Sequence, residues 1–337
     1  MTLPKIIVTR KLPDPVEARL VSACDATFNP CDAPMSLTEL SAAMRNFDAL
    51  VPTVGDLIDT NILKTKGRQV GVITNVGVRY SNIDTDTARE LGIIVTNTPD
   101  VLTDATADIA MLLILAATRG AYVAETKLRE GRWARFSVVE GLGTSIQGKI
   151  LSIIGMGRIG RATARRATLG FGMDVVFYNR SPLGALGFAA WRLDSIEAVM
   201  SKAGVVSVHV PGGGATPLIT ADHIAAMKPG AYFVNTARGD SVDQTALIQS
   251  LDEGRIAGAG LDVFKNEPSV PNALRQMDNI TLLPHIGSAT AEVRTAMGML
   301  AADNLDAFLQ AKTYPAGWCT NNRTSIRSDC LRFHRGS

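Results

Sequence analysis

The chain has 337 residues, of which 46% are hydrophobic and 20% charged; this balance suggests a compact protein with two domains and excludes a disordered or collagen-like chain. Its 34 basic and 32 acidic side chains leave a formal charge of +2, which gives no indication of nucleic acid or an anionic membrane as a partner. The four cysteines form no CxxC pair and are too few for a disulfide framework, so we expect a reducing compartment and no metal cluster.

No segment has the length of a membrane span. The longest purely apolar run, residues 109–117, is about half of the roughly 20 residues needed to cross a bilayer. The first residues, MTLPKIIVTRKL, lack the apolar stretch of a signal peptide. The sequence therefore predicts a cytoplasmic protein with no membrane partner.

The first hundred residues alternate short β-like runs with polar or helical stretches. This alternation is typical of a parallel sheet with crossover helices. The predicted strands are residues 5–9, 49–53, 69–73 and 93–96.

A long helix is predicted over residues 103–119, with Thr103 as its N-cap and Gly120 as its stop. Its surface is apolar around most of the circumference. We therefore expect it to be buried between domains or between subunits.

A second series of strands begins near residue 150, and its six members suit a doubly wound sheet. After Ser288 the pattern becomes helical again over residues 291–310, and this helix is expected to fold back on the first domain. Two α/β units joined by two such crossings would leave a cleft between them. The predicted strands are residues 150–154, 174–178, 205–210, 231–235, 258–263 and 280–283.

A glycine motif lies between the first strand of this series and a helix-forming run. Gly155, Gly157 and Gly160 form GxGxxG, with Arg158 and Ile159 between the last two glycines. The first glycine permits a tight turn, the second lets the backbone approach a pyrophosphate, and the third lets helix and strand pack closely. A glycine-rich structural turn is the alternative, but the strand and helix on either side favour dinucleotide binding.

The next strand predicts which dinucleotide is preferred. At its end, where an acidic residue would bind the ribose 2′-hydroxyl of NAD, the chain has Asn179, Arg180 and Ser181. A guanidinium and a hydroxyl would hold a 2′-phosphate, so NADPH is predicted as the preferred cofactor, with NADH also usable. The alternative is that Arg180 is a solvated surface charge.

Three later strand ends carry ionisable residues: Arg238, Glu267 and His285. Carboxyl ends of strands are where ligands bind in this architecture. These are the groups that the reduction of an α-keto acid needs. His285, as a protonated imidazole, would donate to the carbonyl oxygen, and Glu267 would orient the ring. Arg238 would bind the substrate carboxylate as a fixed cation. We expect structural roles for His209, which lies in a predicted strand, for His223, which lies on a polar helical stretch, and for His334.

These segments resemble the D-isomer-specific 2-hydroxyacid dehydrogenases, and within that family the glyoxylate/hydroxypyruvate reductases. The resemblance rests on the glycine motif, on residues 235–239 (NTARG), on 260–264 (GLDVF) followed by Glu267 and Pro268, and on 284–290 (PHIGSAT). Residues 97–108 match the family's interdomain segment. The final stretch, residues 315–337, departs from the family's usual ending, and we assign it no function.

The resemblance implies two doubly wound parallel-sheet domains with a cleft between them. A flavodoxin-like substrate domain would comprise residues 1–98 and 288–337, and a Rossmann cofactor domain residues 99–287. It also implies a homodimer with the helix after Thr103 in the interface, and catalytic roles for Arg238, Glu267 and His285. Asp262 would contact the nicotinamide, and the other residues implied for the cofactor groove are Pro211, Thr216, Thr236, Ala237 and Ser288.

The family also binds the substrate carboxylate through backbone N–H groups of a loop, which corresponds here to Gly77, Val78 and Arg79. The family's usual Val-Gly pair becomes Val78-Arg79. Arg79 is either a second cation for a larger or more anionic keto acid or a surface arginine on an accommodated loop.

The function predicted from these features is NADPH-dependent reduction of a small 2-keto acid, with glyoxylate and hydroxypyruvate first and 2-ketogluconate next. One alternative is a dehydrogenase of the same fold that acts on phosphoglycerate, formate or phosphite. The other is a dinucleotide-sensing binding protein similar to transcriptional corepressors, which ranks last because the chain has no DNA-binding motif.

Overall fold

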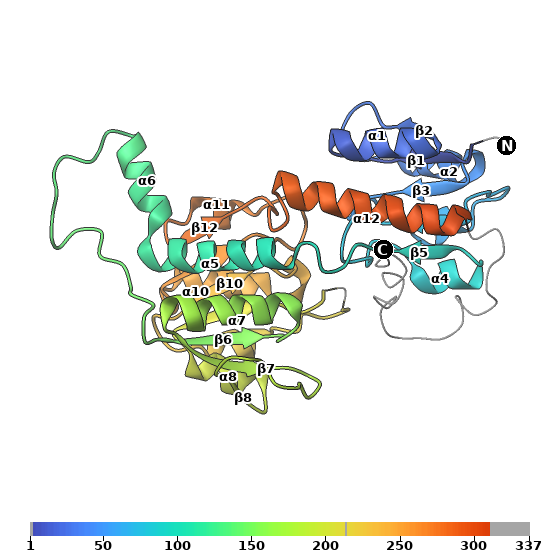
Figure 1. The fold of residues 1–337 in the computed structure, drawn as a ribbon. Helices are drawn as coiled ribbons and strands as arrows, with labels where there is room; N and C mark the ends of the chain where they lie inside the picture. Colours follow the sequence, from blue (N-terminus) through green and yellow to red (C-terminus); the bar gives the residue numbers. More distant parts are fainter. Residues whose placement is uncertain (1–2, 213, 311–337) are drawn as a thin grey trace, which may run out of the picture. The chain divides into compact units, whose positions relative to one another are not determined.

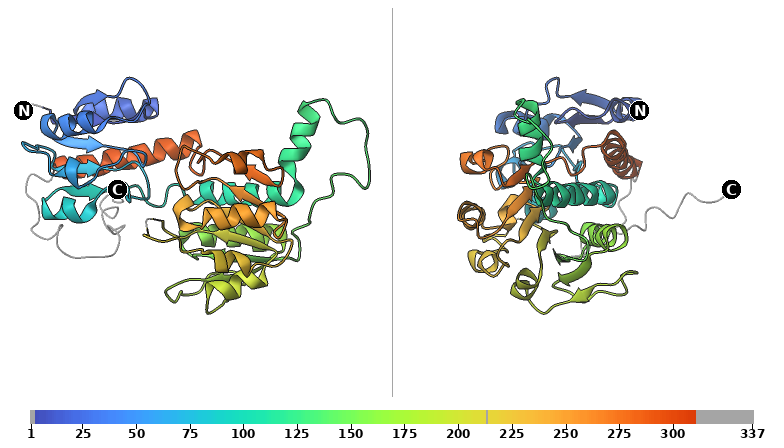
Figure 2. Two further views of the ribbon diagram at one scale, coloured as in Figure 1. Left: turned by 180° about the vertical axis from the view of Figure 1, so that it is seen from behind. Right: turned by 90° about the vertical axis from the view of Figure 1, so that its left-hand side faces the viewer.

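The computed structural model describes residues 3–212 and 214–310, so the interpretations of His334 and of residues 315–337 fall outside the described residues. The chain forms two compact units (Figures 1 and 2). The first unit combines the residues up to Val101 with those from Thr290 onward, and the second unit is Leu102–Ala289.

The first unit contains a five-stranded parallel sheet in the order β2-β1-β3-β4-β5. This is the strand order of flavodoxin-like folds, and it confirms the predicted fold class for this unit. The strands are β1 (Lys5–Val8), β2 (Asp25–Phe28), β3 (Ala49–Val51), β4 (Val72–Thr74) and β5 (Ile94–Thr96).

Helices bury the apolar side chains of this sheet. Leu40, Ile62 and Ala88, from three helices, pack with alternate residues of β1, β3 and β4 in one cluster. The predicted helix over residues 291–310 is confirmed as α12, which packs against α1 and β4; an added Cβ on Gly298 would lie 2.6 Å from Val16, so a glycine permits this approach. The helices are α1 (Asp14–Ala23), α2 (Leu37–Asn46), α3 (Thr60–Leu63), α4 (Thr85–Glu90) and α12 (Ala291–Gln310).

The second unit contains a seven-stranded parallel sheet in the order β12-β11-β10-β9-β6-β7-β8. The chain starts in the middle with β6, moves to one edge through β7 and β8, and then returns to build the other half from β9 onward. This is the Rossmann order with one additional strand, and ligands bind where such an order reverses. The strands are β6 (Ile150–Ile154), β7 (Asp174–Tyr178), β8 (Trp191–Arg192), β9 (Val205–Val208), β10 (Tyr232–Asn235), β11 (Gly258–Leu261) and β12 (Ile280–Leu282).

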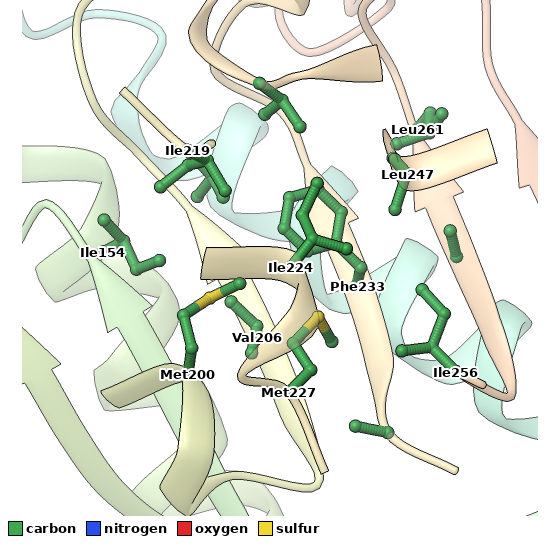
Figure 3. Close-up of a cluster of buried hydrophobic side chains, with 14 of the residues drawn as sticks. Ile154, Met200, Val206, Ile219, Ile224, Met227, Phe233, Leu247, Ile256 and Leu261 are labelled. Atoms are coloured by element: carbon green, nitrogen blue, oxygen red, sulfur yellow. The ribbon is translucent and has the colours of Figure 1, made fainter. Parts of the chain in front are cut away.

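Alternate residues of these strands enter two different cores, as the two-residue period of a strand requires. On one face Leu151 and Ile153 pack with residues of α5 and α7. On the other face Ile154 and Phe233 pack with α8, α9 and α10 (Figure 3). The helices are α5 (Thr103–Arg119), α6 (Ala121–Arg129), α7 (Arg158–Phe171), α8 (Ile196–Lys202), α9 (Ala221–Ala225), α10 (Gln244–Asp252) and α11 (Asn272–Gln276), and a short 3-10 turn spans Gly239–Ser241.

The long helix α5 begins differently from its prediction. Thr103 is its first helical residue and not its N-cap, which is Leu102 and makes no side-chain capping bond. The helix packs on β10, β11 and α7 of its own unit, and its apolar residue Leu112 is exposed. Its place between domains or between subunits stays a prediction. Gly120, with a φ of 58°, ends the helix as predicted.

Four details of the strand prediction were also wrong. The edge strands β2 and β8 were missed, so the second sheet has seven strands and not six. The strand predicted over residues 69–73 is Val72–Thr74, because the Gln69 and Gly71 N–H groups donate to Met44 and Asp48 outside the sheet ladder. His209 follows β9 and does not lie within it.

Candidate active site

The glycine turn after β6 is fixed by the protein's own packing. Gly155 has a φ of 95°, which L side chains rarely adopt, and an added Cβ would lie 2.7 Å from the His209 carbonyl oxygen. At Gly160 an added Cβ would lie 2.2 Å from the Gly155 carbonyl oxygen. The helix α7 therefore packs on the turn only because residue 160 has no side chain.

Gly157 is a glycine for a different reason. An added Cβ would meet no protein atom within 4 Å, and its φ of −76° suits any residue. The next residue, Arg158, is exposed and begins α7, and no side-chain hydrogen bond caps this N-terminus. Ile159 follows, partly buried. Open space over an uncapped helix N-terminus fits the pyrophosphate of a dinucleotide.

The end of β10 provides a second observation that fits a cofactor. Thr236 is buried, and its Oγ1 has no hydrogen-bond partner among the described residues. A buried hydroxyl without a partner is unfavourable, and a ligand that supplies the missing bond would remove the penalty. Ala237 is buried next to it, whereas Pro211 and Thr216 are exposed on the segment after β9.

The end of β7 connects the glycine turn to the residues predicted to select the cofactor. Asn179 Oδ1 accepts a hydrogen bond from Met156 N–H at 3.1 Å, and its Nδ2 donates to the Ser181 carbonyl at 2.8 Å. Arg180 and Ser181 are exposed. Arg192, on β8, donates from Nη2 to the Asn179 carbonyl at 3.0 Å. Two arginines therefore flank this strand end, and sequence reasoning found only Arg180 because β8 was missed.

His285 and Glu267 form a hydrogen-bonded pair. Nδ1 of His285 lies 2.6 Å from Oε2 of Glu267, and the Phe264 N–H donates to Oε1 at 2.9 Å. Burial raises the pKa of Glu267, but His285, the Phe264 N–H and the Arg238 charge outweigh burial and leave the pKa below its ordinary value. The carboxylate is therefore held in its ionised form beside the imidazole.

Asp262 holds the loop that carries His285. Its carboxylate oxygens accept hydrogen bonds from Ile286 N–H at 2.7 Å and Gly287 N–H at 2.9 Å, and its carbonyl accepts from His285 N–H at 2.9 Å. Burial raises the pKa of Asp262, although the two N–H donors act in the opposite direction. Ser288 follows in the same loop. The family resemblance implied a nicotinamide contact for Asp262 and did not indicate that Asp262 holds the loop of His285.

Arg238 follows β10 on a tightly held backbone. Its carbonyl accepts hydrogen bonds from Asn235 Nδ2 at 2.8 Å and Ser241 Oγ at 2.6 Å, and its own Nη1 donates to the Ala237 carbonyl at 3.0 Å. Burial lowers the pKa of Arg238, while the nearby carboxylates, Glu267 first, raise it. The guanidinium remains a fixed cation near the histidine pair.

All these groups follow strands of one parallel sheet. The glycine turn follows β6, Arg238 follows β10, Glu267 and Asp262 follow β11, and His285 follows β12. Carboxyl ends of parallel strands meet at one edge of a sheet, so the topology brings together a cofactor site, a cation and a histidine–carboxylate pair. This is a set of groups suited to hydride and proton transfer.

Gly77, Val78 and Arg79 belong to the first unit, in the loop after β4. An added Cβ on Gly77 would lie 2.3 Å from Val54, so the loop requires glycine there. Val78 and Arg79 are partly buried.

The remaining described histidines lie apart from the Glu267–His285 pair. The N-cap of α9 is Thr220, whose N–H donates to Nδ1 of His223 at 3.1 Å, and Nε2 of His223 lies 3.0 Å from Oε1 of Glu197. Nε2 of His209 lies 2.9 Å from Ser207 Oγ, and burial lowers the pKa of His209 to about 3. Its main chain supports the glycine turn.

Within residues 3–212 and 214–310 no group of three or more His, Cys, Asp or Glu side chains could hold a metal ion. In the same ranges no single helix is long and apolar enough to cross a membrane; only the bent pair of α5 and α6 passes that test together.

Comparison with known proteins identifies the family. Residues 111–287 match the NAD binding domain of the D-isomer specific 2-hydroxyacid dehydrogenases. The chain is also 40% identical over 321 residues to the glyoxylate reductase of Thermococcus litoralis, covering 93% of this chain and 96% of the relative. The chain belongs to the D-isomer-specific 2-hydroxyacid dehydrogenase family.

Solved structures of relatives agree with this assignment. A glyoxylate reductase from Paecilomyes thermophila matches with a TM-score of 0.81 and 31% identity, covering 92% of this chain and 96% of the relative. An NADPH-dependent glyoxylate/hydroxypyruvate reductase from Sinorhizobium meliloti, whose structure contains NADP and malonate, matches with a TM-score of 0.80 and 35% identity, covering 91% and 94%. The protein is an NAD(P)-dependent oxidoreductase with two parallel-sheet α/β units, as the sequence predicted.

Proposed function

We propose that this dehydrogenase uses NADPH to reduce glyoxylate and hydroxypyruvate to the corresponding 2-hydroxy acids, with 2-ketogluconate as a further substrate. The observation that carries the proposal is the 2.6 Å contact between Glu267 and His285 at the sheet edge that also bears the glycine turn. Relatives over nearly the whole chain carry the name glyoxylate reductase.

The residues divide the reaction between them. A nicotinamide dinucleotide held at the glycine turn would supply the hydride for the carbonyl carbon. His285 donates a proton to the carbonyl oxygen, and Glu267 holds the imidazolium in place. Arg238 grips the substrate carboxylate and polarises the carbonyl, because a guanidinium fork matches a carboxylate. One keto acid, one NADPH and one proton give one hydroxy acid and one NADP⁺.

The substrate carboxylate also needs neutral donors. The N–H groups of the loop of Gly77, Val78 and Arg79 supply them. Arg79 is either a second cation that binds the substrate or a surface arginine with no part in recognition. Comparing Arg79→Gly with the parent on glyoxylate and 2-ketogluconate decides, since an unchanged kcat/KM on both removes Arg79 from recognition.

The end of β7 supports the proposed preference for NADPH. Arg180 and Ser181 are exposed there and Arg192 lies against the same backbone, so up to two guanidiniums and a hydroxyl can face a 2′-phosphate. Because Asn179 is neutral, this strand end lacks the carboxylate that would favour NADH.

We further propose a homodimer. Beyond α5, the helix α6 and residues 130–143 present apolar side chains to solvent, with Phe136 81% exposed and Val139 78% exposed. A hollow of about 840 Å³ lies between this segment, the end of α5 and β12. Such an apolar surface is unusual on a monomer. A second copy, as the family resemblance implies, would cover it.

Sedimentation of the parent and of a Phe136→Asp, Val139→Asp double variant tests the homodimer. We expect the parent to sediment as a dimer and the double variant as a monomer, and a parent that sediments as a monomer contradicts the proposal.

The reaction is tested by initial rates of NADPH and NADH oxidation with glyoxylate, hydroxypyruvate, pyruvate and 2-ketogluconate. The His285→Ala variant serves as the matched blank, and we expect it to lose about 10²- to 10⁴-fold in kcat. NADPH-linked turnover of glyoxylate or hydroxypyruvate that disappears in His285→Ala supports the proposal. Absence of turnover with all four acids refutes it.

A further inference from the structure

The backbone of the loop that carries His285 needs support from its surroundings. His285 has a φ of 54°, in the left-handed region that is unfavourable for a residue with a side chain. Such a backbone persists only where neighbouring groups hold it. The N–H groups of His285, Ile286 and Gly287 all donate to Asp262, the first to its carbonyl and the other two to its carboxylate. The contacts of this loop therefore decide where the imidazole lies.

A threonine of α5 holds the same loop through a carbonyl group. Thr106 is 6% exposed, and its Oγ1 donates to the Gly287 carbonyl at 3.1 Å. An added Cβ on Gly287 would lie 3.2 Å from Asp262 Oδ2 and 3.3 Å from Thr106 Cγ2, so this glycine fits closely between the two side chains. The N–H of Gly287 is thus fixed by Asp262 and its carbonyl by Thr106.

The hydroxyl of Thr106 bonds in a way that sets it apart from other buried helical threonines. Inside a helix, a threonine hydroxyl commonly donates to the carbonyl three or four residues earlier. Thr118 on the same helix and Thr163 on α7 both donate to the carbonyl four residues earlier, at 2.7 Å and 3.0 Å. Thr106 instead donates to a carbonyl 181 residues later in the chain. Its hydroxyl therefore ties α5 to the loop of His285.

We propose that Thr106 is a positioning residue for proton transfer by His285. By holding the Gly287 carbonyl, its hydroxyl fixes the loop and keeps the imidazole where it pairs with Glu267. This inference rests on the proposed function and deepens it, because it assigns the placement of the proton donor to a side chain whose hydroxyl bonds the loop and not the ring.

The central test is Thr106→Val, which keeps the shape of the side chain and removes the hydroxyl. A less accurately placed imidazole should lower kcat for glyoxylate about 10-fold, since a misplaced catalytic group costs up to about 100-fold. Thr118→Val is the matched control, because it removes a buried hydroxyl of the same helix whose bonds stay within that helix. The measurements are kcat with glyoxylate and the Kd of NADPH from a fluorescence titration. They are made well below the thermal midpoint of each variant, so that lost stability is not mistaken for lost kcat.

A second pair of variants separates the hydroxyl from the rest of the side chain. Thr106→Ser keeps the hydroxyl and Thr106→Ala lacks it, while both lose the methyl group. We therefore expect kcat of Thr106→Ser to exceed that of Thr106→Ala about 10-fold, the typical effect of one lost hydrogen bond. This comparison holds even where Thr106→Val does not fold.

A positioning role also predicts what does not change. In Thr106→Val the Kd of NADPH stays within about 2-fold of the parent, and Thr118→Val matches the parent in kcat. If the parent reduces glyoxylate but Thr106→Val and Thr106→Ala keep its kcat, the inference is wrong and the proposed function stands. Equal losses of kcat in Thr106→Val and Thr118→Val, or an equal loss of NADPH affinity, would show general damage and also refute it. A parent that reduces none of the keto acids removes the proposed function and this inference with it.

Discussion

Oε2 of Glu267 lies 2.6 Å from Nδ1 of His285, and the other carboxylate oxygen accepts from the Phe264 N–H. The carboxylate is thus tied at both oxygens. Because Nδ1 of the imidazole is engaged, Nε2 is the ring nitrogen from which His285 would donate a proton in the proposed reaction. In that reaction Glu267 would set the direction of the ring and stabilise its charged form.

Glu267→Gln tests this dependence. The pKa of Glu267 lies below its ordinary value, so the carboxylate is ionised across the neutral range. Glutamine keeps the shape and removes the charge. We expect kcat for glyoxylate reduction to fall about 100-fold at pH 7.5, because the ring loses its charged partner. The measurement is kcat for the parent, Glu267→Gln and the exposed control Glu253→Gln. A kcat of Glu267→Gln within about 2-fold of the parent contradicts the pairing role.

Arg238→Lys tests whether binding of the substrate carboxylate depends on the charge of Arg238 alone or also on the planar, two-pronged geometry of its guanidinium. Lysine keeps the positive charge but cannot form two parallel hydrogen bonds to a carboxylate. We expect KM for the keto acid to rise about 10- to 100-fold, since charge-assisted hydrogen bonds contribute roughly 1.5–3 kcal/mol. The KM for NADPH should change less than 2-fold. Steady-state kinetics with each substrate varied in turn checks both values, and a loss confined to kcat would instead assign Arg238 to the chemical step.

The sequence predicted best those elements that are buried on both sides. The strands β6 and β7 were located to the residue because ILSII and DVVFY are apolar runs between turn signals. By contrast, β2 and β8 lie at sheet edges, where Asp25–Phe28 and Trp191–Arg192 are partly or wholly exposed. An edge strand forms because it pairs with one neighbouring strand, and the hydrophobic periodicity of its own sequence does not reveal that pairing.

The candidate site divides in a similar way. Ionisable residues at strand ends, such as Glu267 and His285, were visible because chemistry requires these residue types there. The anchoring role of Asp262 was not visible, because the role of a buried polar side chain is defined by the backbone groups that it satisfies, and those come from a loop distant in sequence. An aspartate directly after a buried strand, as Asp262 is after β11, can serve several purposes, and only the fold selects among them.

Asn179→Asp tests the cofactor preference. Aspartate retains the acceptor for the Met156 N–H but loses the donor to the Ser181 carbonyl, and its charge would repel a 2′-phosphate. We expect the ratio of kcat/KM for NADPH to that for NADH to fall at least about 10-fold. Arg192→Gln, which keeps a neutral donor near the Asn179 carbonyl, should lower the ratio less. Equal ratios in parent and Asn179→Asp would place cofactor selection elsewhere.

His209 makes stability depend on pH. Burial lowers the pKa of His209 to about 3 from an ordinary value of 6.5, so between these values the unfolded chain binds a proton that the folded chain does not. This contribution to stability is complete above pH 6.5 and is lost as the pH falls below it, by up to about 1.4 kcal/mol per pH unit. Urea unfolding at pH 7.5, 6 and 5 should show the parent losing stability faster than His209→Gln. Parallel losses in the two proteins would show that His209 is not held neutral.

Gly157→Ala and Gly160→Ala form a matched pair that separates a glycine kept for a ligand from one kept for packing. An added Cβ at Gly160 would lie 2.2 Å from the Gly155 carbonyl oxygen, so this variant should lose about 1–3 kcal/mol of stability.

At Gly157 the added Cβ meets no protein atom within 4 Å and the φ suits alanine, so the thermal midpoint of Gly157→Ala should stay at or above that of the parent. That same Cβ would occupy the space a pyrophosphate needs, and KM for NADPH should rise at least about 10-fold. Thermal unfolding and NADPH titration of both variants check the pair. A Gly157→Ala protein that binds NADPH as the parent does would mean that the open space over α7 is not the phosphate site.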